Sequence, residues 1–188
     1  PEIAEGNLPF AFSLPADELK RLIDKTRFAI STEETRYYLN GIYLHVAEGP
    51  DGRRLRAVAT DGHRLARVEA DVPEGAAGMP GVIVPRKAVG ELRKLVDEVD
   101  AEVSVALSET KIRFVFGDVV LVSKLIDGSF PDYERVIPAG NDKMVRIDCK
   151  PFAAAVDRVA TISSEKSRAV RFSLTDGRLD LAVTSPDN

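Results

Sequence analysis

Two periods of apolar residues follow one another along the start of the chain. The segment "FAFSLP" alternates apolar and polar positions, which is typical of a half-buried strand. The next segment, "ADELKRLIDK", repeats its apolar residues every three or four positions, as a helix with one buried face does. Pro15 stands between the two, and proline is favoured in the first turn of a helix. We therefore expect a strand followed by a helix near Pro15 to Lys25.

The strand–proline–helix pattern occurs three times. It returns with a helix expected near Pro85 to Val96, and again from Pro151 onward, at intervals of about 70 residues. Each predicted helix is followed by segments of alternating hydrophobicity, including "RYYLNGIYLHVAEG" and "VVLVSKLID". This order predicts an α+β fold of repeated strand–helix–antiparallel-strand units. We expect the first two helices to lie on the same side of one continuous curved sheet.

Turn-rich stretches divide the chain into parts. Residues 1–9 are expected to be a linker, which the family resemblance described below assigns to a missing first domain, and residues 10–138 contain two rounds of the pattern and form a complete domain. Residues 139–144 are expected to be a second linker, and residues 145–188 the truncated start of a further domain. Because the chain lacks an initiating Met, we expect it to begin inside a longer protein.

Composition narrows the classes of function. The 188 residues carry a formal net charge of −4, which argues against coating nucleic acid by bulk charge but leaves room for a local basic face. Cys149 is the single cysteine, so neither an intrachain disulfide nor a cysteine-built zinc site is expected, and a reducing cytoplasm is favoured. No apolar run is long enough to span a bilayer, and the N-terminus does not resemble a signal peptide. We expect no cofactor, no metal and no membrane partner.

The stretch "ATDGHRLARVEA" first suggests chemistry, because Asp61 and His63 lie close together. A nucleophile–base pair needs a third group and an oxyanion site, and zinc needs three or four converging ligands; nothing nearby completes either set. An Asp-Gly pair between two β-favouring runs is instead a strong hairpin signal, with Gly62 at positive φ. We therefore expect a tight turn and no catalytic residue, and His45 reads as an ordinary strand residue.

The basic residues of the two helices have two possible interpretations. Those expected on the faces away from the core are Arg21, Lys25, Lys87 and Lys94. They can form an ordinary solvated surface, or they can face the phosphates of a nucleic acid. The acidic neighbours Asp17, Asp24 and Glu91 dilute the second interpretation.

Four segments, in order, carry a resemblance to a known family. "RYYLNGIYL", "VATDGHRLA", "VIVPRKAVGEL" and "SKLIDGSFPDYERVIP" resemble the bacterial β sliding clamp, the processivity subunit of DNA polymerase III. The resemblance covers the middle domain of the family and the start of its third. It implies a DNA clamp fold whose dimer closes a ring around duplex DNA without reading its sequence, with helices lining the hole and sheets outside.

The resemblance also implies partners and site residues. A non-catalytic clamp recruits the polymerase III catalytic subunit, the clamp loader, and other polymerases and repair proteins through a peptide pocket between the second and third domains. By motif matching, the peptide-binding residues are Arg36, Leu39, Thr60, Gly62, His63, Arg64, Leu65, Pro131, Arg135 and Val136. The apolar members among them offer a slot for the Leu/Phe end of a peptide. The expected DNA-binding residues are Arg21, Lys25, Tyr38, Lys87 and Lys94.

Departures from the family pattern leave some of these contacts open. Ser167 stands where some clamps have an aromatic residue bordering the pocket, and Glu33 and Glu34 stand in a loop that contacts DNA in some relatives. Two rival functions also stay open. One is a small hydrolase that uses Asp61 and His63, and the other is a peptide-binding adaptor with no role on DNA.

Overall fold

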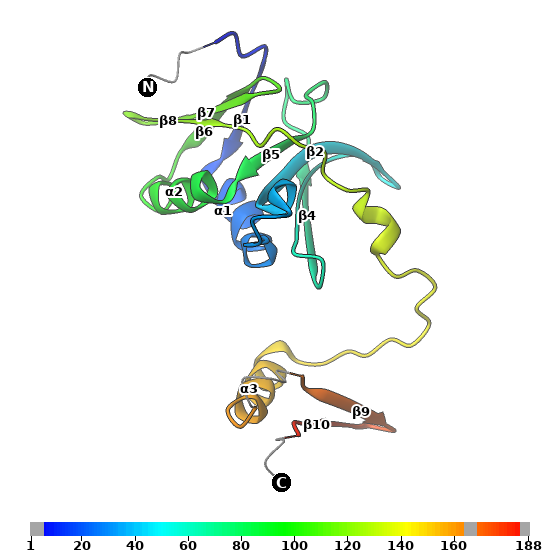
Figure 1. Cartoon of the computed structure of the whole chain (residues 1–188). Helices are drawn as coiled ribbons and strands as arrows, with labels where there is room; N and C mark the ends of the chain where they lie inside the picture. Colours follow the sequence, from blue (N-terminus) through cyan, green and yellow to red (C-terminus); the bar gives the residue numbers. More distant parts are fainter. Residues whose placement is uncertain (1–5, 164–168, 185–188) are drawn as a thin grey trace. The chain divides into compact units, whose positions relative to one another are not determined.

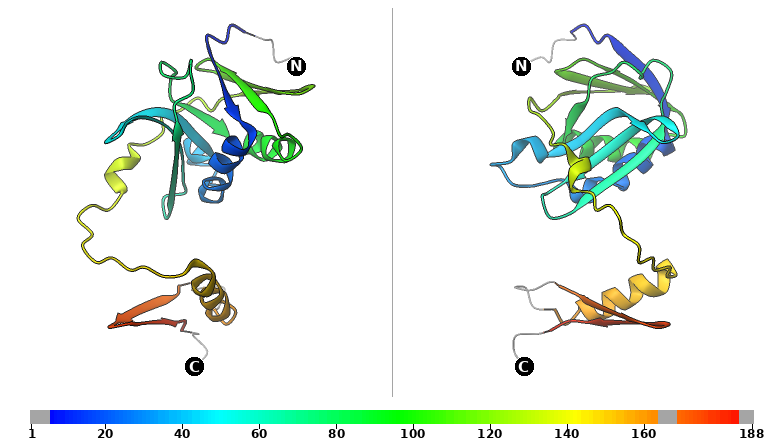
Figure 2. Two further views of the ribbon diagram at one scale, coloured as in Figure 1. Left: turned by 180° about the vertical axis from the view of Figure 1, so that it is seen from behind. Right: turned by 90° about the vertical axis from the view of Figure 1, so that its right-hand side faces the viewer.

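The chain divides into two compact units. The computed structural model describes residues 6–163 and 169–184, and its units are residues 1–136 and 137–188 (Figures 1 and 2). Ser167, where we expected a departure from the family pattern, lies outside the described residues.

Unit 1 holds two rounds of strand, helix and antiparallel strands. Its strands and helices are β1 (Phe10–Pro15), α1 (Ala16–Asp24), β2 (Gly41–Gly49), β3 (Gly52–Thr60), β4 (Leu65–Asp71), β5 (Val82–Pro85), α2 (Arg86–Val96), β6 (Glu102–Leu107), β7 (Lys111–Phe116) and β8 (Val119–Lys124). Short 3₁₀ turns lie at η1 (Arg27–Ala29), η2 (Tyr37–Leu39) and η3 (Tyr133–Val136). The two helices are confirmed close to their predicted bounds, with Pro15 and Pro85 as the residues that immediately precede them.

The expectation of one continuous sheet is wrong. Unit 1 has two four-stranded antiparallel sheets, which we call the β1 sheet (order β1-β6-β7-β8) and the β3 sheet (order β4-β3-β2-β5). They approach where the Ile126 N–H, just after β8, donates to the carbonyl of Ile83 in β5 at 3.0 Å. The sheets stay separate because β5 pairs with β2 and β8 pairs with β7, while β5 and β8 share no ladder.

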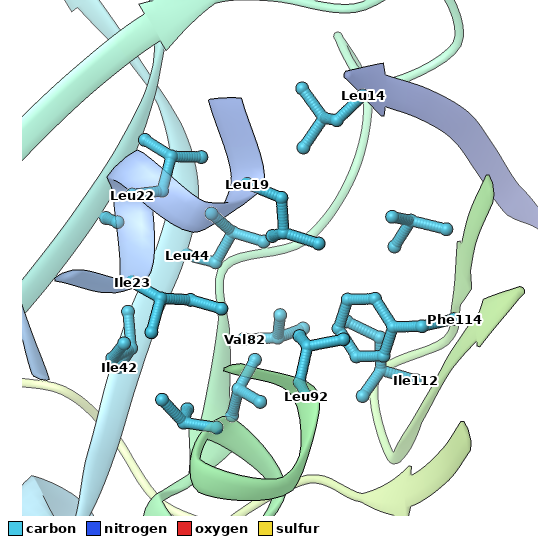
Figure 3. Close-up of a cluster of buried hydrophobic side chains, with 14 of the residues drawn as sticks. Leu14, Leu19, Leu22, Ile23, Ile42, Leu44, Val82, Leu92, Ile112 and Phe114 are labelled. Atoms are coloured by element: carbon cyan, nitrogen blue, oxygen red, sulfur yellow. The ribbon is translucent and has the colours of Figure 1, made fainter. Parts of the chain in front are cut away.

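One core lies between the helices and both sheets. Figure 3 shows Leu22 of α1, Leu92 of α2 and Phe114 of β7 directed toward a common centre with Leu44 of β2. Leu22 and Leu92 are each 2% exposed, as the helical periodicity predicted. α1 and α2 lie side by side in Figure 1, so both sheets bury their inner faces against one pair of helices.

Two local predictions from the pattern are wrong. Tyr37 and Tyr38 do not begin a strand, because η2 precedes β2 and leaves Tyr37 53% exposed. Residues 145–148 were expected to form a third strand, yet they have no regular structure before α3 (Cys149–Ala160). Their counterpart β1 pairs with β6 from the following round, and no such partner occurs among the described residues of unit 2.

Unit 2 combines α3 with a hairpin of β9 (Arg171–Thr175) and β10 (Arg178–Ala182). The ring of Phe152 in α3 lies 5.8 Å from that of Phe172 in β9, which packs the helix on the hairpin. Gly177 has φ +67 and supplies the left-handed backbone of the hairpin turn.

The shared core makes a direct prediction. Leu92→Ala should lower the free energy of unfolding by about 2–5 kcal/mol, because it opens a cavity between α2 and both sheets. Urea denaturation followed by circular dichroism measures this loss. Lys87→Ala, on the exposed face of the same helix, is the control and should change stability by less than about 0.5 kcal/mol. A similar small change for Leu92→Ala would contradict the shared core.

Candidate functional site

The outer face of the β3 sheet contains a buried arginine. Alternation along β3 points Leu55 and Ala57 into the core, so Arg56 and Val58 lie on the opposite face. Arg56 is nevertheless only 4% exposed, and Val58 is fully buried. A second layer must therefore cover this face of the sheet.

The covering layer is the segment of residues 130–136, which we call the arm. Phe130 stacks on Tyr43 of β2 with ring centroids 4.7 Å apart, and Tyr43 stacks on His45 at 4.4 Å. The ring of Tyr133 meets His45 edge-on at 5.6 Å. Phe130 and Tyr133 of the arm thus pack on the adjacent rings of Tyr43 and His45 in β2 and fix the arm on the sheet.

Polar groups complete the attachment of the arm around Arg56. Nε of Arg56 donates to Oε1 of Glu69 on β4 at 2.7 Å, and Nη1 of Arg56 donates to the Tyr133 hydroxyl at 3.2 Å. Nη1 also forms an ion pair with Glu134 of the arm. Burial lowers the pKa of Arg56, but the hydrogen bonds to Tyr133 and Glu69 raise it overall. The guanidinium is thus charged and paired, as a buried cation must be.

A polar turn follows β3 at residues 61–64. Oδ1 of Asp61 accepts from the backbone N–H groups of His63 at 2.9 Å and Arg64 at 3.0 Å, and Oδ2 accepts from Nε of Arg64 at 3.1 Å. Burial raises the pKa of Asp61, but these hydrogen bonds lower it overall. The Asp61 carboxylate is therefore committed to the turn. Gly62 has the predicted positive φ, +87.

The loop is longer than the two-residue hairpin that the Asp-Gly pair suggested. Thr60 and Leu65 form the last pair of the ladder, which leaves four residues in the loop. The Thr60 hydroxyl donates to the carbonyl of Arg64 at 2.8 Å and accepts from the N–H of Gly62 at 3.1 Å. These side-chain bonds close the wider loop.

Two arginines from the predicted peptide-binding set, Arg36 and Arg64, pack around the turn. A Cβ on Gly62 would lie 2.5 Å from Nη1 of Arg36, so the guanidinium of Arg36 rests directly over the glycine. Arg36 is held there by Glu33, with contacts of 2.9 and 2.7 Å. The second arginine of the turn, Arg64, places its guanidinium 5.6 Å from the ring centroid of Phe28, a contact of the cation–π type.

The predicted peptide-binding residues are thus of three kinds. One group surrounds the turn: Arg36, Thr60, Gly62, His63, Arg64 and Leu65. A second group is exposed on the arm: Pro131, Arg135 and Val136, the last 67% exposed. Leu39 belongs to neither group, since it is 4% exposed and its carbonyl accepts from the Ser31 N–H at 3.1 Å. The side chain of Leu39 is therefore not accessible to a peptide on the surface of unit 1.

The turn and the arm share the outer face of the β3 sheet. Leu65, Arg67 and Glu69 alternate onto that face of β4. Glu69 accepts from Arg56, and Nη1 of Arg67 lies 4.0 Å from Oε1 of Glu134 in the arm. β4 therefore links the two parts of the candidate site. It begins at Leu65, directly after the turn, and its residues Arg67 and Glu69 lie beside the groups that hold the arm.

Sequence reasoning missed the residues that support the arm. His45 appeared only as an ordinary strand residue, and Arg56 and Tyr133 were not singled out. Phe28, which is 55% exposed beside Arg64, was also missed. The available signal was the density of aromatic residues in "IYLHV" and "FPDY", which is high for a chain with 6% aromatics.

The four basic residues predicted to bind DNA lie on or directly after α1 and on α2, whereas Tyr38 lies in η2. Arg21, Lys25, Lys87 and Lys94 are all exposed, and Tyr38 is half-buried. Arg21 donates to Oε1 of Glu18 at 2.6 Å, and Nζ of Lys94 lies 3.1 Å from Oε1 of Glu91. Acidic neighbours therefore offset part of the positive charge, as the sequence suggested.

A separate charged seam joins α1 to α2. Arg93 contacts Oδ1 of Asp24 at 2.5 Å and Oδ2 of Asp97 at 2.7 Å, and Lys20 pairs with Asp97. Hydrogen bonds from Lys20 and Arg93 lower the pKa of Asp97 to about 2. These charges are engaged in holding the helices together.

Membrane-spanning helices and clustered metal ligands are both absent from the part of the chain that the structure describes. No helix there is long and apolar enough to cross a membrane. Within residues 6–163 and 169–184, no group of three or more His, Cys, Asp or Glu side chains is arranged to hold a metal ion.

Solved structures identify the class to which this arrangement belongs. A DnaN sliding clamp from Bartonella birtlesii, solved bound to griselimycin, matches with a TM-score of 0.94 and 57% identity over 100% of this chain and 50% of that chain. The DNA polymerase III subunit beta of Pseudomonas aeruginosa matches with a TM-score of 0.89 and 42% identity over the same shares. The fold is that of the sliding clamps.

Sequence comparison then gives the family. Residues 13–132 match the DNA polymerase III beta subunit, central domain, and residues 134–188 match its C-terminal domain. The beta sliding clamp of Caulobacter vibrioides is 55% identical over 183 residues, which are 97% of this chain and 49% of that protein. The chain belongs to the DNA polymerase III beta-subunit family. It spans about half the length of the curated relatives it matches.

The geometry of the turn predicts opposite effects for two glycine replacements. Gly62→Ala should lower the free energy of unfolding by about 1 kcal/mol or more, because an L-residue at φ +87 is strained and its Cβ displaces Arg36. Gly90→Ala in α2 has open space and an ordinary φ, so it should raise stability by about 0.5–1 kcal/mol. Urea denaturation of both variants provides the test. Effects of the same sign would contradict the strained turn at Gly62.

Proposed function

We propose that the full-length protein is a non-catalytic sliding clamp of the cytoplasm. It closes as a dimeric ring around duplex DNA, confers processivity on the polymerase III catalytic subunit, and recruits the clamp loader and other polymerases and repair proteins. Membership in the beta-subunit family and the match to sliding-clamp structures support this proposal. In this view residues 10–138 are the middle domain, residues 139–144 a linker, and residues 145–188 the start of the third domain.

One observation carries the peptide-binding part of the proposal. The turn and the arm present exposed basic and apolar side chains beside the outer face of the β3 sheet. The turn is closed by hydrogen bonds to Asp61, and the arm is attached to the sheet through Tyr133. A pre-ordered surface loses little conformational entropy when a peptide binds. Leu65 and Val136 supply apolar contact for a Leu/Phe end, while Arg36, Arg64 and Arg135 can donate to peptide carbonyls or acidic flanks.

The hydrolase alternative loses its main support. Both oxygens of Asp61 accept hydrogen bonds within the turn, and no nucleophile–base pair with His63 is formed. The other alternative, a peptide-binding adaptor, would not bind duplex DNA, whereas a clamp should bind it through the basic residues on the helices.

Val136 provides the test of the peptide site. Val136→Asp should weaken binding of a Gln-Leu-Phe-type peptide by at least about 1–3 kcal/mol, because a carboxylate would be desolvated against the apolar end. Titration of a labelled peptide into the full-length protein measures the change. Since Val136 is 67% exposed, the variant should fold normally, which circular dichroism checks.

The matched control for this titration is Val120→Asp. Val120 is also an exposed valine, at 56%, but it lies on β8, away from the turn and the arm. It should leave the affinity unchanged. Equal affinities for wild type and folded Val136→Asp would place the peptide site elsewhere.

DNA binding should depend on the exposed lysines of α2. Replacing Lys87 and Lys94 together by Glu should weaken binding of the full-length protein to duplex DNA. It should also reduce the slope of log K against log salt by about 0.9 for each phosphate that is no longer neutralised. Arg53→Glu, an exposed position at the β2–β3 hairpin, is the control. An unchanged affinity and slope in the double variant would remove α2 from the DNA face.

A further inference from the structure

We propose that Arg56, Tyr133 and His45 form a positioning cluster for the peptide site, and that proton uptake by His45 releases the arm and weakens peptide binding. This inference rests on the proposed peptide-binding function. The three residues touch no peptide themselves in this proposal. They act through the arm, which carries Pro131, Arg135 and Val136.

The arm depends on a small number of contacts. Phe130, Tyr133 and Glu134 attach it to β2 and β3, through the stack on Tyr43, the two hydrogen bonds of the Tyr133 hydroxyl and the ion pair with Arg56. The intervening and following side chains are exposed, and among the described residues Arg135 pairs with its neighbour Asp132 at 2.8 Å. The position of the exposed side chains therefore follows the attachment of Tyr133.

A neutral His45 that carries its proton on Nδ1 satisfies both hydrogen bonds of the Tyr133 hydroxyl. The Tyr133 oxygen accepts from Nη1 of Arg56, and its single hydrogen can then be donated to Nε2 of His45, 2.9 Å away. A protonated His45 would direct an N–H at the same oxygen, leaving the hydroxyl hydrogen without its acceptor. It would also place a second positive charge beside the buried guanidinium.

The charges around His45 favour the neutral form. Tyr43 stacks on the ring from β2, Arg56 faces it from β3, and Tyr133 and Glu134 face it from the arm. From β4, Glu69 neutralises Arg56, and Arg67 lies beside Glu134. Burial and then Arg56 lower the pKa of His45, while the Val46 backbone and Glu134 raise it by less. Glu134 is therefore not enough to stabilise the protonated form of His45, and the pKa of His45 stays below its usual value.

The direction of the pH effect follows from this shift. When the arm is released, His45 is solvated and its pKa returns toward 6.5. The released state then binds the proton more tightly than the attached state does. Attachment of the arm is therefore complete above pH 6.5 and weakens as the pH falls below it.

The test is the pH profile of peptide affinity for the full-length protein. A Gln-Leu-Phe peptide with blocked ends does not titrate in this range. Its affinity should fall at least about threefold from pH 7.5 to 5.5, and by no more than about tenfold per pH unit, the limit for one proton. His45→Gln, which keeps an acceptor but cannot become charged, should flatten the profile. Tyr133→Phe, which keeps the ring and loses the hydroxyl, should weaken binding at pH 7.5.

The second histidine supplies the matched control. His63→Gln should retain the ratio of affinities between pH 7.5 and 5.5, whatever its affinity at the higher pH. A flat profile in wild type, or the same profile in His45→Gln, would overturn the proposal. Absence of any peptide binding by wild type at pH 7.5 would overturn the proposed function instead.

Hydrogen exchange keeps the positioning cluster testable without a peptide. Backbone amides of residues 130–136 in the free full-length protein should lose protection at pH 5.5 relative to pH 7.5, after correction for intrinsic exchange rates. His45→Gln should remove this difference. Equal protection of the arm at both pH values in wild type would overturn the cluster independently of the binding result.

Discussion

The burial of the Arg56 guanidinium on the outer face of the β3 sheet governs the arrangement of the candidate peptide surface. A charged group with 4% exposure is tolerated only where partners satisfy it. Those partners come from β4 and from the arm, through Glu69, Tyr133 and Glu134. A residue in the middle of a strand therefore determines where a segment 77 positions later lies.

The same constraint explains how much of the fold could be predicted. The core-facing positions of α1, α2 and the strands follow from periodicity, because apolar side chains at helical or alternating spacing have one stable destination. Alternation also places Arg56 on the face opposite Leu55, but it cannot say whether that face meets solvent or a second layer. The arm shows neither the helical nor the alternating spacing of apolar residues. Its position therefore depends on long-range contacts that no local pattern encodes.

The separation into two sheets has a similar origin. A short apolar run predicted β5 and alternation predicted β8, yet pairing partners are set by three-dimensional register, and each strand pairs away from the other. In the candidate site, the positive φ of Gly62 and a structural role for Asp61 could be predicted from the Asp-Gly signal. The approach of Arg36 over Gly62 could not, since it depends on η2 lying against the turn.

The proposed peptide and DNA surfaces differ in how their cations are held, and this suits different tasks. Arg56 is buried in a fixed network, which favours one geometry of the arm and hence a defined peptide surface. Arg21 and Lys94 lie on exposed helix faces beside Glu18 and Glu91, where solvent screens each pair, although Arg21 also donates to the Glu69 carbonyl at 2.6 Å. Exposed, partly neutralised cations attract phosphates weakly and without a preferred register. In the proposed clamp, such contacts would let duplex DNA move past the helices, whereas a fixed network of the Arg56 kind would hold it in place.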